Sequence, residues 1–254
     1  MKKLNFIIKY GLALLLLSFY SCESWLNVTP SDRLSEEMLF NDREGFVKAL
    51  NGVYIELNTN ELYGRNLTAG ALDVMGQYYS VASSSHAFYN YGGLVYTGND
   101  EKALFDNMWQ KCYAVIACCN TIIEKCDENK AGLSPVWRGS IKGEALALRA
   151  MLHFDMLRLF GPLTSELDKE SIPYQTNSDQ TVTPLLSGSE VIGLILDDLK
   201  NAVGLLKDTD PYFVEEEFSD TDLNYRRFRM NYFAAKGLMA RVQLWGGDKE
   251  KAAI

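Results

Sequence analysis

Three observations predict a mainly α protein, built from tetratricopeptide-like helical hairpins with long irregular loops. Residues 141–160 form a long run of strong helix formers, and the run stops at Gly161-Pro162. Four further segments carry apolar residues at helical spacing, and they follow one another in successive pairs. Residues 67–105 show no helical period beyond a turn or two. No tight 34-residue repeat is present, so the likeness to tetratricopeptide arrays depends on the pairing of Ala- and Leu-rich helices.

Residues 1–21 predict a signal peptide. Two lysines follow Met1, and the apolar run Tyr10–Phe19 comes next. The run has the length of a signal-peptide core and is shorter than the roughly 20 residues that a membrane-spanning helix needs.

Ser21-Cys22 resembles a lipobox, in which the cysteine thiol receives a lipid and becomes the mature N-terminus. Phe19 and Tyr20 depart from the residues that usually precede this cysteine. Because a small residue still precedes the cysteine, we expect lipidation at Cys22 and a lipid-anchored tether over residues 22–34. The alternatives are an uncleaved anchor, or an ordinary signal peptide in which Cys22 has no role.

The helical body is predicted from residue 35 to residue 254. Asn41 reads as an N-cap with Glu44 three residues on, opening a helix with an apolar stripe. The stripe consists of Phe46, Leu50, Val53 and Leu57. A helix from about Asp106 to Cys126 and the central helix, which begins near Trp137, form an antiparallel hairpin across a turn.

The central helix is apolar on two sides, so we expect it to pack against other helices on both. Small residues along it, among them Gly143, allow a second helix to come close. Its histidine, His153, is expected to be packed or hydrogen-bonded within the helical body.

The C-terminal part is predicted to contain two more helices and the start of a third. Residues 163–186 are irregular, and Ser187 with Glu190 forms a capping box that opens a helix over 191–206. Residues 210–225 are acidic, which predicts an exposed loop. A helix follows over 230–245, and 249–254 reads as the first turn of another helix, cut short.

Four of the five cysteines lie on one predicted helix, at positions 112, 118, 119 and 126. Cys112, Cys119 and Cys126 are seven residues apart, so each step is about 10.5 Å along a helix axis. A disulfide needs Cα atoms within about 7 Å, and zinc needs all its ligands around one point. We therefore expect buried, small apolar side chains and no metal site.

The composition argues against nucleic-acid binding and against catalysis. The formal net charge is −8, and three of the lysines fall within the predicted signal peptide. Nucleic acids need clustered Lys and Arg. Nucleophile, metalloprotease and phosphate-loop motifs are absent from the sequence, and loose acidic pairs are usually solvated surface. We expect neither an active site nor a cofactor.

The candidate ligand site is the long loop region, which is rich in Tyr, Ser, Asn and Gly. Loops of this length in a compact protein are usually functional or mobile. Tyrosine offers a sugar both a flat apolar face and a hydroxyl group. The ligand-binding candidates are Asp73, Tyr78, Tyr79, His86, Phe88, Tyr89, Tyr91 and Tyr96, with Asn90 and Asn99 as polar companions. The alternative is that most of these rings pack the loop onto the helices.

The pattern G-E-A-x-x-x-R-A-x-x-x-F-x-x-x-R-x-F-G-P, from Gly143 to Pro162, resembles the signature of the SusD/RagB family of Bacteroidetes outer-membrane nutrient-binding lipoproteins. Three other segments resemble the family in the same order. They are F-x-x-x-L-x-G-x-Y from Phe46, I-x-D-D-L-x-x-A from Ile195 and A-x-G-L-x-A-R-V-x-L from Ala235.

The resemblance implies divergent tetratricopeptide units and a family length about twice that of this chain, so we expect an N-terminal portion. It also implies a surface-facing outer-membrane lipoprotein that binds an oligosaccharide and delivers it to a SusC-type TonB-dependent transporter. The alternatives are a RagB-like peptide binder, a tetratricopeptide-like protein-interaction scaffold, and, least favoured, an enzyme.

Overall fold

The structure is a computed structural model that describes residues 36–179, 181–214, 218–219 and 225–253. Contacts divide the chain into two units, residues 1–39 and residues 40–254. Helix α2 (Glu36–Leu39) belongs to the first unit. The predicted signal peptide and tether, including Cys22, lie outside the described residues. The fold below is that of the second unit.

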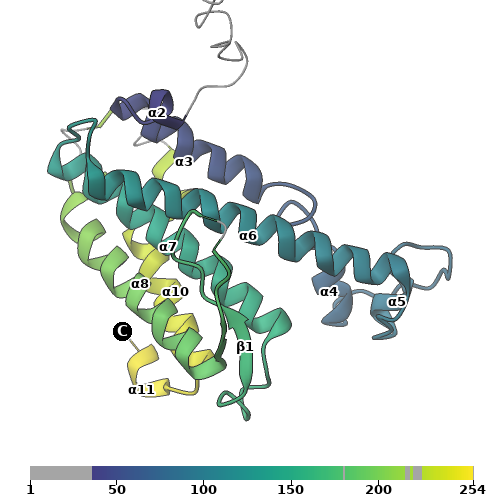
Figure 1. Ribbon diagram of the computed structural model, residues 1–254. Coiled ribbons are helices and arrows are strands. Elements are labelled where there is room, and N and C mark those ends of the chain that lie inside the picture. Colours follow the sequence, from purple (N-terminus) through teal and green to yellow (C-terminus); the bar gives the residue numbers. More distant parts are fainter. Residues whose placement is uncertain (1–35, 180, 215–217, 220–224, 254) are drawn as a thin grey trace, which may run out of the picture. The chain divides into compact units, whose positions relative to one another are not determined.

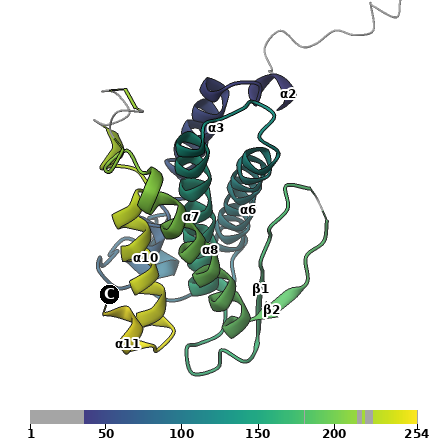
Figure 2. The same cartoon turned by 90° about the vertical axis from the view of Figure 1, so that its left-hand side faces the viewer.

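Helix α7 (Pro135–Phe160) is the central element of this unit (Figures 1 and 2). It contacts α3 (Arg43–Leu57), α6 (Asn99–Glu128), α8 (Gly188–Thr209) and α10 (Tyr232–Trp245). Most of its residues are buried, which confirms the predicted packing on both sides.

Local chemistry sets the ends of α7. The Ser134 hydroxyl accepts from the Trp137 N–H, Pro135 occupies the first turn, and Gly161 caps the C-terminus. The helix therefore begins two residues before the predicted Trp137. Gly143 permits the close approach of α8, since a Cβ there would lie 2.8 Å from Leu206 Cγ.

The ends of α3 and α6 differ from the prediction. The carboxylate of Asp42, and not Asn41, caps α3 by accepting from the Gly45 N–H at 2.8 Å. Helix α6 begins at Asn99, seven residues before the predicted Asp106. Its first turns contain Glu, Lys, Ala and Leu, which favour a helix and extend it into the segment predicted as loop.

Residues 163–186, predicted as irregular, include two short antiparallel strands, β1 (Glu170–Pro173) and β2 (Leu185–Ser187). The strands, of four and three residues, are too short to show an alternating pattern in the sequence. Ile172 of β1 is buried, and the pair contacts α7 and α8. The capping box of Ser187 and Glu190 that opens α8 is confirmed.

After α8 the prediction of an exposed acidic loop is wrong at Asp210, which is fully buried. Both its carboxylate oxygens accept from Arg226, at 3.0 and 2.6 Å, so a distant residue compensates its charge. Helix α10 begins two residues later than predicted, and α11 (Lys249–Ala252) confirms the start of a helix near residue 249.

The cysteine prediction is confirmed at three positions and wrong at one. Cys112, Cys119 and Cys126 are buried, whereas Cys118 is exposed, because adjacent helical residues point about 100° apart. All four are free thiols. Among the described helices, none combines the length and apolar character needed to cross a membrane.

Candidate functional site

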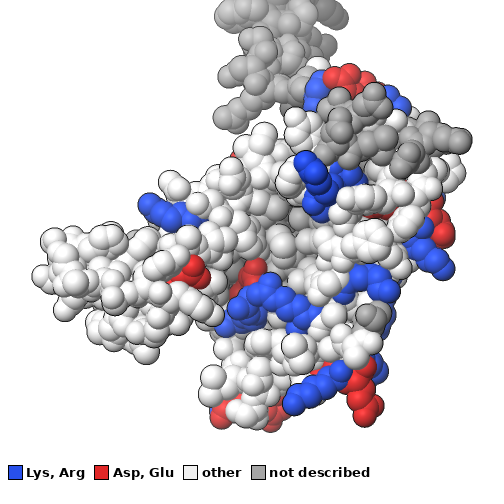
Figure 3. All heavy atoms as spheres, turned by 180° about the vertical axis from the view of Figure 1, so that it is seen from behind, with Lys and Arg blue, Asp and Glu red and all other residues white. Residues whose placement is uncertain are grey.

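The segment that carries the predicted ligand residues is almost free of charge. Between Asn66 and Asn99, Asp73 is the only Asp, Glu, Lys or Arg. We call this segment the uncharged lobe. It contains α4 (Ala71–Met75) and α5 (Tyr89–Gly92), and it projects beside the N-terminal end of α6 (Figure 1). Figure 3 shows few charged atoms on this projection.

Two side-chain amides hold the lobe together. Gln77, which has a φ of 62°, donates from Nε2 to the Gly92 carbonyl at 3.0 Å and so joins α4 to α5. Asn90 donates from Nδ2 to Glu101 Oε1 at 2.7 Å, and Glu101 is buried in the first turn of α6. Asn90, predicted as a ligand companion, is therefore already engaged with the protein.

Four of the predicted aromatic residues form one chain of ring contacts. The centroid distances are 5.7 Å from His86 to Phe88, 5.9 Å from Phe88 to Tyr91 and 6.3 Å from Tyr91 to Tyr96. Phe105 of α6 continues the chain, 5.4 Å from Tyr96.

Within this chain Tyr91 is 2% exposed, and burial raises its pKa to about 12, with a smaller effect of nearby Glu101. The His86 imidazole is exposed, and its Nδ1 accepts from the Phe88 N–H at 3.1 Å. The structure thus places Tyr91 inside the lobe and leaves His86 at its surface.

The other three predicted rings lie on the surface of the lobe. Tyr78, Tyr79 and Tyr89 are 80%, 53% and 42% exposed. Tyr78 lies three residues after the end of α4, and its N–H donates to the Asp73 carbonyl at 2.9 Å. Asp73 itself is half-buried on α4, and Asn99 is exposed where α6 begins. Exposed phenol rings on an uncharged surface can stack on sugar rings and exchange hydrogen bonds with hydroxyls.

Sequence reasoning missed the residues that anchor this lobe. From Phe105 the ring contacts run to Phe160 at the end of α7, at 6.2 Å, and from there to Trp109 at 5.1 Å. The Arg65 guanidinium lies 5.8 Å from the Phe88 ring centroid. The i, i+4 spacing of Phe105, Trp109 and Tyr113 was a local signal for a row of rings on α6.

The charged residues in the first half of the signature, Glu144 and Arg149, are buried and structural. Arg149 donates from Nε and Nη2 to the two oxygens of Asp198, both at 2.7 Å, and from Nη1 to Asn120 Oδ1 at 2.9 Å. The Tyr174 hydroxyl donates to Asp198 Oδ2 at 2.5 Å. Burial raises the pKa of Tyr174 well above its usual value, with Asp198 adding to the effect. This network ties α6, α7 and α8 together.

His153 confirms the predicted structural role. A backbone N–H can only donate, so Nε2 accepts from Gln175 at 3.0 Å and Nδ1 donates to the Arg149 carbonyl at 3.0 Å. The imidazole is therefore neutral, and burial lowers its pKa to about 3. The Tyr174 ring stacks on it at 3.9 Å.

Glu144, the second residue of the signature, lies in a second buried network. Its carboxylate accepts from Tyr54, Arg226 and Arg229. Burial alone would raise the pKa of Glu144, but the two guanidinium groups hold it below its ordinary value.

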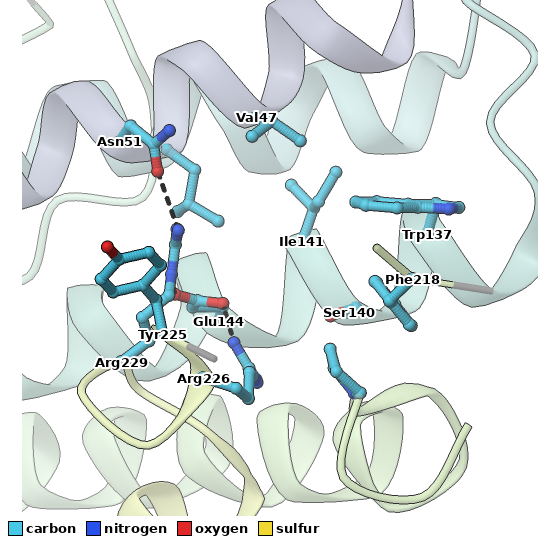
Figure 4. A pocket seen from close by; sticks show the side chains of 12 residues that line it. Val47, Asn51, Trp137, Ser140, Ile141, Glu144, Phe218, Tyr225, Arg226 and Arg229 are labelled. Atoms are coloured by element: carbon cyan, nitrogen blue, oxygen red, sulfur yellow. Dashed lines mark hydrogen bonds and ion pairs between the residues drawn. The ribbon is translucent and has the colours of Figure 1, made fainter. Parts of the chain in front are cut away.

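Two hollows open beside this second network. A cavity of about 320 Å³ is lined by residues of α3 and α7 and by Pro211, Phe218, Tyr225, Arg226 and Arg229 (Figure 4). A neighbouring one of about 340 Å³ is lined mainly by apolar atoms of α3, α7 and residues 228–234. In the part of the chain that the structure describes, no three His, Cys, Asp or Glu side chains are grouped so as to hold a metal ion.

Comparisons with known proteins agree with this architecture. The chain matches a SusD-like family, described as starch-binding and associating with the outer membrane, over residues 24–244. It is 25% identical over 258 residues to a SusD-like protein of Formosa agariphila, covering 99% of this chain and 44% of the relative. It is 28% identical over 162 residues to a SusD-like protein of Bacteroides ovatus, covering 60% of this chain and 26% of the relative.

Solved structures show the same fold. A SusD-like carbohydrate-binding protein from Bacteroides vulgatus superposes with a TM-score of 0.66 at 24% identity, covering 84% of this chain and 43% of the other. A laminarin-binding SusD-like protein superposes with a TM-score of 0.62 at 17% identity, covering 84% and 42%. The chain thus spans less than half the length of these relatives.

Proposed function

The chain belongs to the SusD-like family, and from this premise we propose that it is a cell-surface glycan-binding protein that captures an oligosaccharide without catalysis. The observation that carries the proposal is the uncharged lobe with its exposed tyrosines. Neutral sugars offer C–H faces for stacking and hydroxyls for hydrogen bonds, and they do not need a charged partner. Relatives described as carbohydrate-binding and laminarin-binding support the ligand class.

The lobe divides the predicted residues into two roles in this proposal. Tyr78, Tyr79 and Tyr89 contact the glycan, because their rings are exposed. Phe88, Tyr91 and Tyr96 hold the loop in place through ring contacts that reach α6. Half-buried Asp73 and exposed His86 supply polar contacts to the glycan.

Calorimetric titration of the chain with neutral oligosaccharides, laminari- and malto-oligosaccharides first, tests the proposal. We expect Tyr78→Ala combined with Tyr79→Ala to weaken the binding by about tenfold, because both stacking faces are lost. Phe233→Ala removes an exposed ring of α10 and serves as the matched control. Binding of peptides with no saccharide bound, or equal affinity in the double variant, would contradict the proposal.

We further propose that the protein delivers its glycan to a SusC-type TonB-dependent transporter and is anchored in the outer membrane through a lipid on Cys22. Both steps rest on family membership and on the lipobox pattern. Co-purification from detergent-solubilised outer membranes tests the partner. Cys22→Ser is expected to move the protein from the membrane fraction to the soluble fraction; retention in the membrane would refute the anchor.

A further inference from the structure

Arg229 lies between the two hollows on the face shared by α3 and the segment from Tyr225 to Met230, and it lines both of them. Asn51 of α3 lines the first hollow, and Asn58, which caps the C-terminus of α3, lines the second. Figure 4 shows Arg229 reaching toward Asn51, with Tyr225 beside it.

The guanidinium of Arg229 is positioned but not saturated. Its Nε donates to Glu144 Oε1 at 2.8 Å, its Nη1 donates to Asn51 Oδ1 at 2.8 Å, and its Cζ lies 4.6 Å from the Tyr54 ring centroid. Among the described residues Nη2 has no hydrogen-bond partner. The side chain is about one-fifth exposed, so its remaining N–H groups are available to a ligand.

Two exposed aromatic rings precede Arg229 closely in the chain, and each lines one of the two hollows that Arg229 lines. Tyr225 is 62% exposed beside the first hollow, and Phe228 is 70% exposed beside the second. The exposed Arg227 guanidinium lies 4.8 Å from the Phe228 ring centroid. Ring faces and guanidinium groups are therefore presented together at the mouth of the hollows.

The residues that the structure describes on this surface are basic on balance, although the net charge of the whole protein is negative. Residues 225–247 contain four Arg and one Lys and no Asp or Glu, in a chain with a net charge of −8. Buried Glu144 and Asp210 offset the charges of Arg226 and Arg229, which leaves Arg227 uncompensated among these groups. Figure 3, which views the face that carries α10, shows Lys and Arg side chains across the middle of that face.

We propose that this surface, formed by Asn51, Tyr225, Arg227, Phe228 and Arg229, is a second saccharide site that selects anionic sugars. A guanidinium makes charge-assisted hydrogen bonds to a carboxylate or a sulfate, and an exposed ring stacks on the sugar face. Uronic acids and sulfate esters share this chemistry. The proposal extends the proposed saccharide binding to a different surface and a different charge class from the uncharged lobe.

The test is calorimetric titration of the chain with a galacturonic acid trisaccharide, a sulfated galactan tetrasaccharide and a neutral laminari-tetrasaccharide. We expect Arg227→Gln and Phe228→Ala, both at exposed positions, and Arg229→Gln each to weaken anionic binding by about tenfold. Lys102→Gln removes an exposed cation from α6 and is expected to leave the affinity for the anionic saccharides unchanged. The two anionic probes separate carboxylate from sulfate recognition.

Arg229→Gln also breaks a contact to the buried Glu144. If this variant fails to fold, the variants at the two exposed positions, Arg227→Gln and Phe228→Ala, decide the outcome. Anionic binding that is equal in wild type, Arg227→Gln and Phe228→Ala overturns the inference, as does the absence of anionic binding. If the anionic saccharides bind and the neutral saccharide does not, the proposed role of the uncharged lobe is overturned, and the second site is still supported. Loss of neutral binding in the Tyr78→Ala, Tyr79→Ala variant with anionic binding retained confirms that the two sites are separate.

Discussion

Arg149 and Glu144 are the residues by which the family resemblance is read, and both are buried in ion-pair networks rather than exposed to a ligand. Each joins residues far apart in sequence: Arg149 reaches Asp198 of α8, and Glu144 reaches Arg226 and Arg229. Removing one partner of a buried ion pair leaves an uncompensated charge, which costs far more than the pair contributes. Their role is to fix the arrangement of the helices.

Two adjacent carboxylates on α8 allow a matched test of this role. We expect Asp198→Asn to lower the free energy of unfolding by about 3–5 kcal/mol, because buried Arg149 loses its counter-ion. Asp197 lies next to it, exposed, with a 2.9 Å contact to Lys200, so Asp197→Asn is expected to change stability little. Urea denaturation of both variants checks the difference; equal midpoints would refute the structural role of Asp198.

His153 predicts a pH dependence of stability with a definite sign. Its pKa is about 3 in the folded chain, against about 6.5 when unfolded, so between these values the unfolded state binds the additional proton. Its contribution to stability is therefore lost as the pH falls from about 6.5 toward 3, at up to about 1.4 kcal/mol per pH unit. Carboxylates also titrate there, so the comparison is with His153→Gln, whose stability should fall less steeply; parallel curves would contradict the assignment.

At the scale of elements, the pairing of α7 with α8 depends on how closely their backbones approach. The helices meet where Gly143 faces Leu206 and the Ala202 carbonyl, and a Cβ on Gly143 would lie 2.8 and 3.2 Å from them. Helix propensity alone would favour Ala at position 143. The close approach of α8, and not the helix propensity of α7, therefore explains the glycine at position 143.

Substitution of this glycine separates packing from propensity. We expect Gly143→Ala to destabilise the fold by about 1–3 kcal/mol, because Leu206 or the backbone must shift. Gly193→Ala and Gly204→Ala on α8, where an added Cβ meets nothing within 4 Å, should instead stabilise by about 0.5–1 kcal/mol. Chemical denaturation of the three variants gives the signs; a stabilising Gly143→Ala would mean that the contact relaxes freely.

At the scale of the whole molecule, charge is divided between surfaces. The uncharged lobe has one charged residue in 66–99, whereas residues 225–247 carry only positive charges. A protein with net charge −8 thus presents a neutral surface and a basic one, which fit different ligands. This division is the physical basis for proposing two separate saccharide sites.

The two surfaces should respond differently to salt. We expect the affinity for neutral oligosaccharides to change less than about twofold between roughly 50 and 500 mM NaCl, because stacking does not depend on charge. Binding of anionic oligosaccharides should weaken severalfold over the same range, as screening reduces the attraction of exposed guanidinium groups. Titration of both ligand classes at the two salt concentrations measures this; equal salt dependence would argue for a single shared site.

The sequence by itself determined the five long helices α3, α6, α7, α8 and α10, though not all of their ends, together with the capping box of Ser187, the family and the segment that forms the lobe. These follow from interactions within one turn of helix or from composition, which are local and can be read along the chain. Only the tertiary structure decided that Tyr91 is buried while Tyr78 is exposed, that Asp210 lies inside, and that Arg229 reaches Glu144. Each of these depends on contacts between residues far apart in sequence, since burial and charge compensation are set by how helices pack and not by the residues beside them.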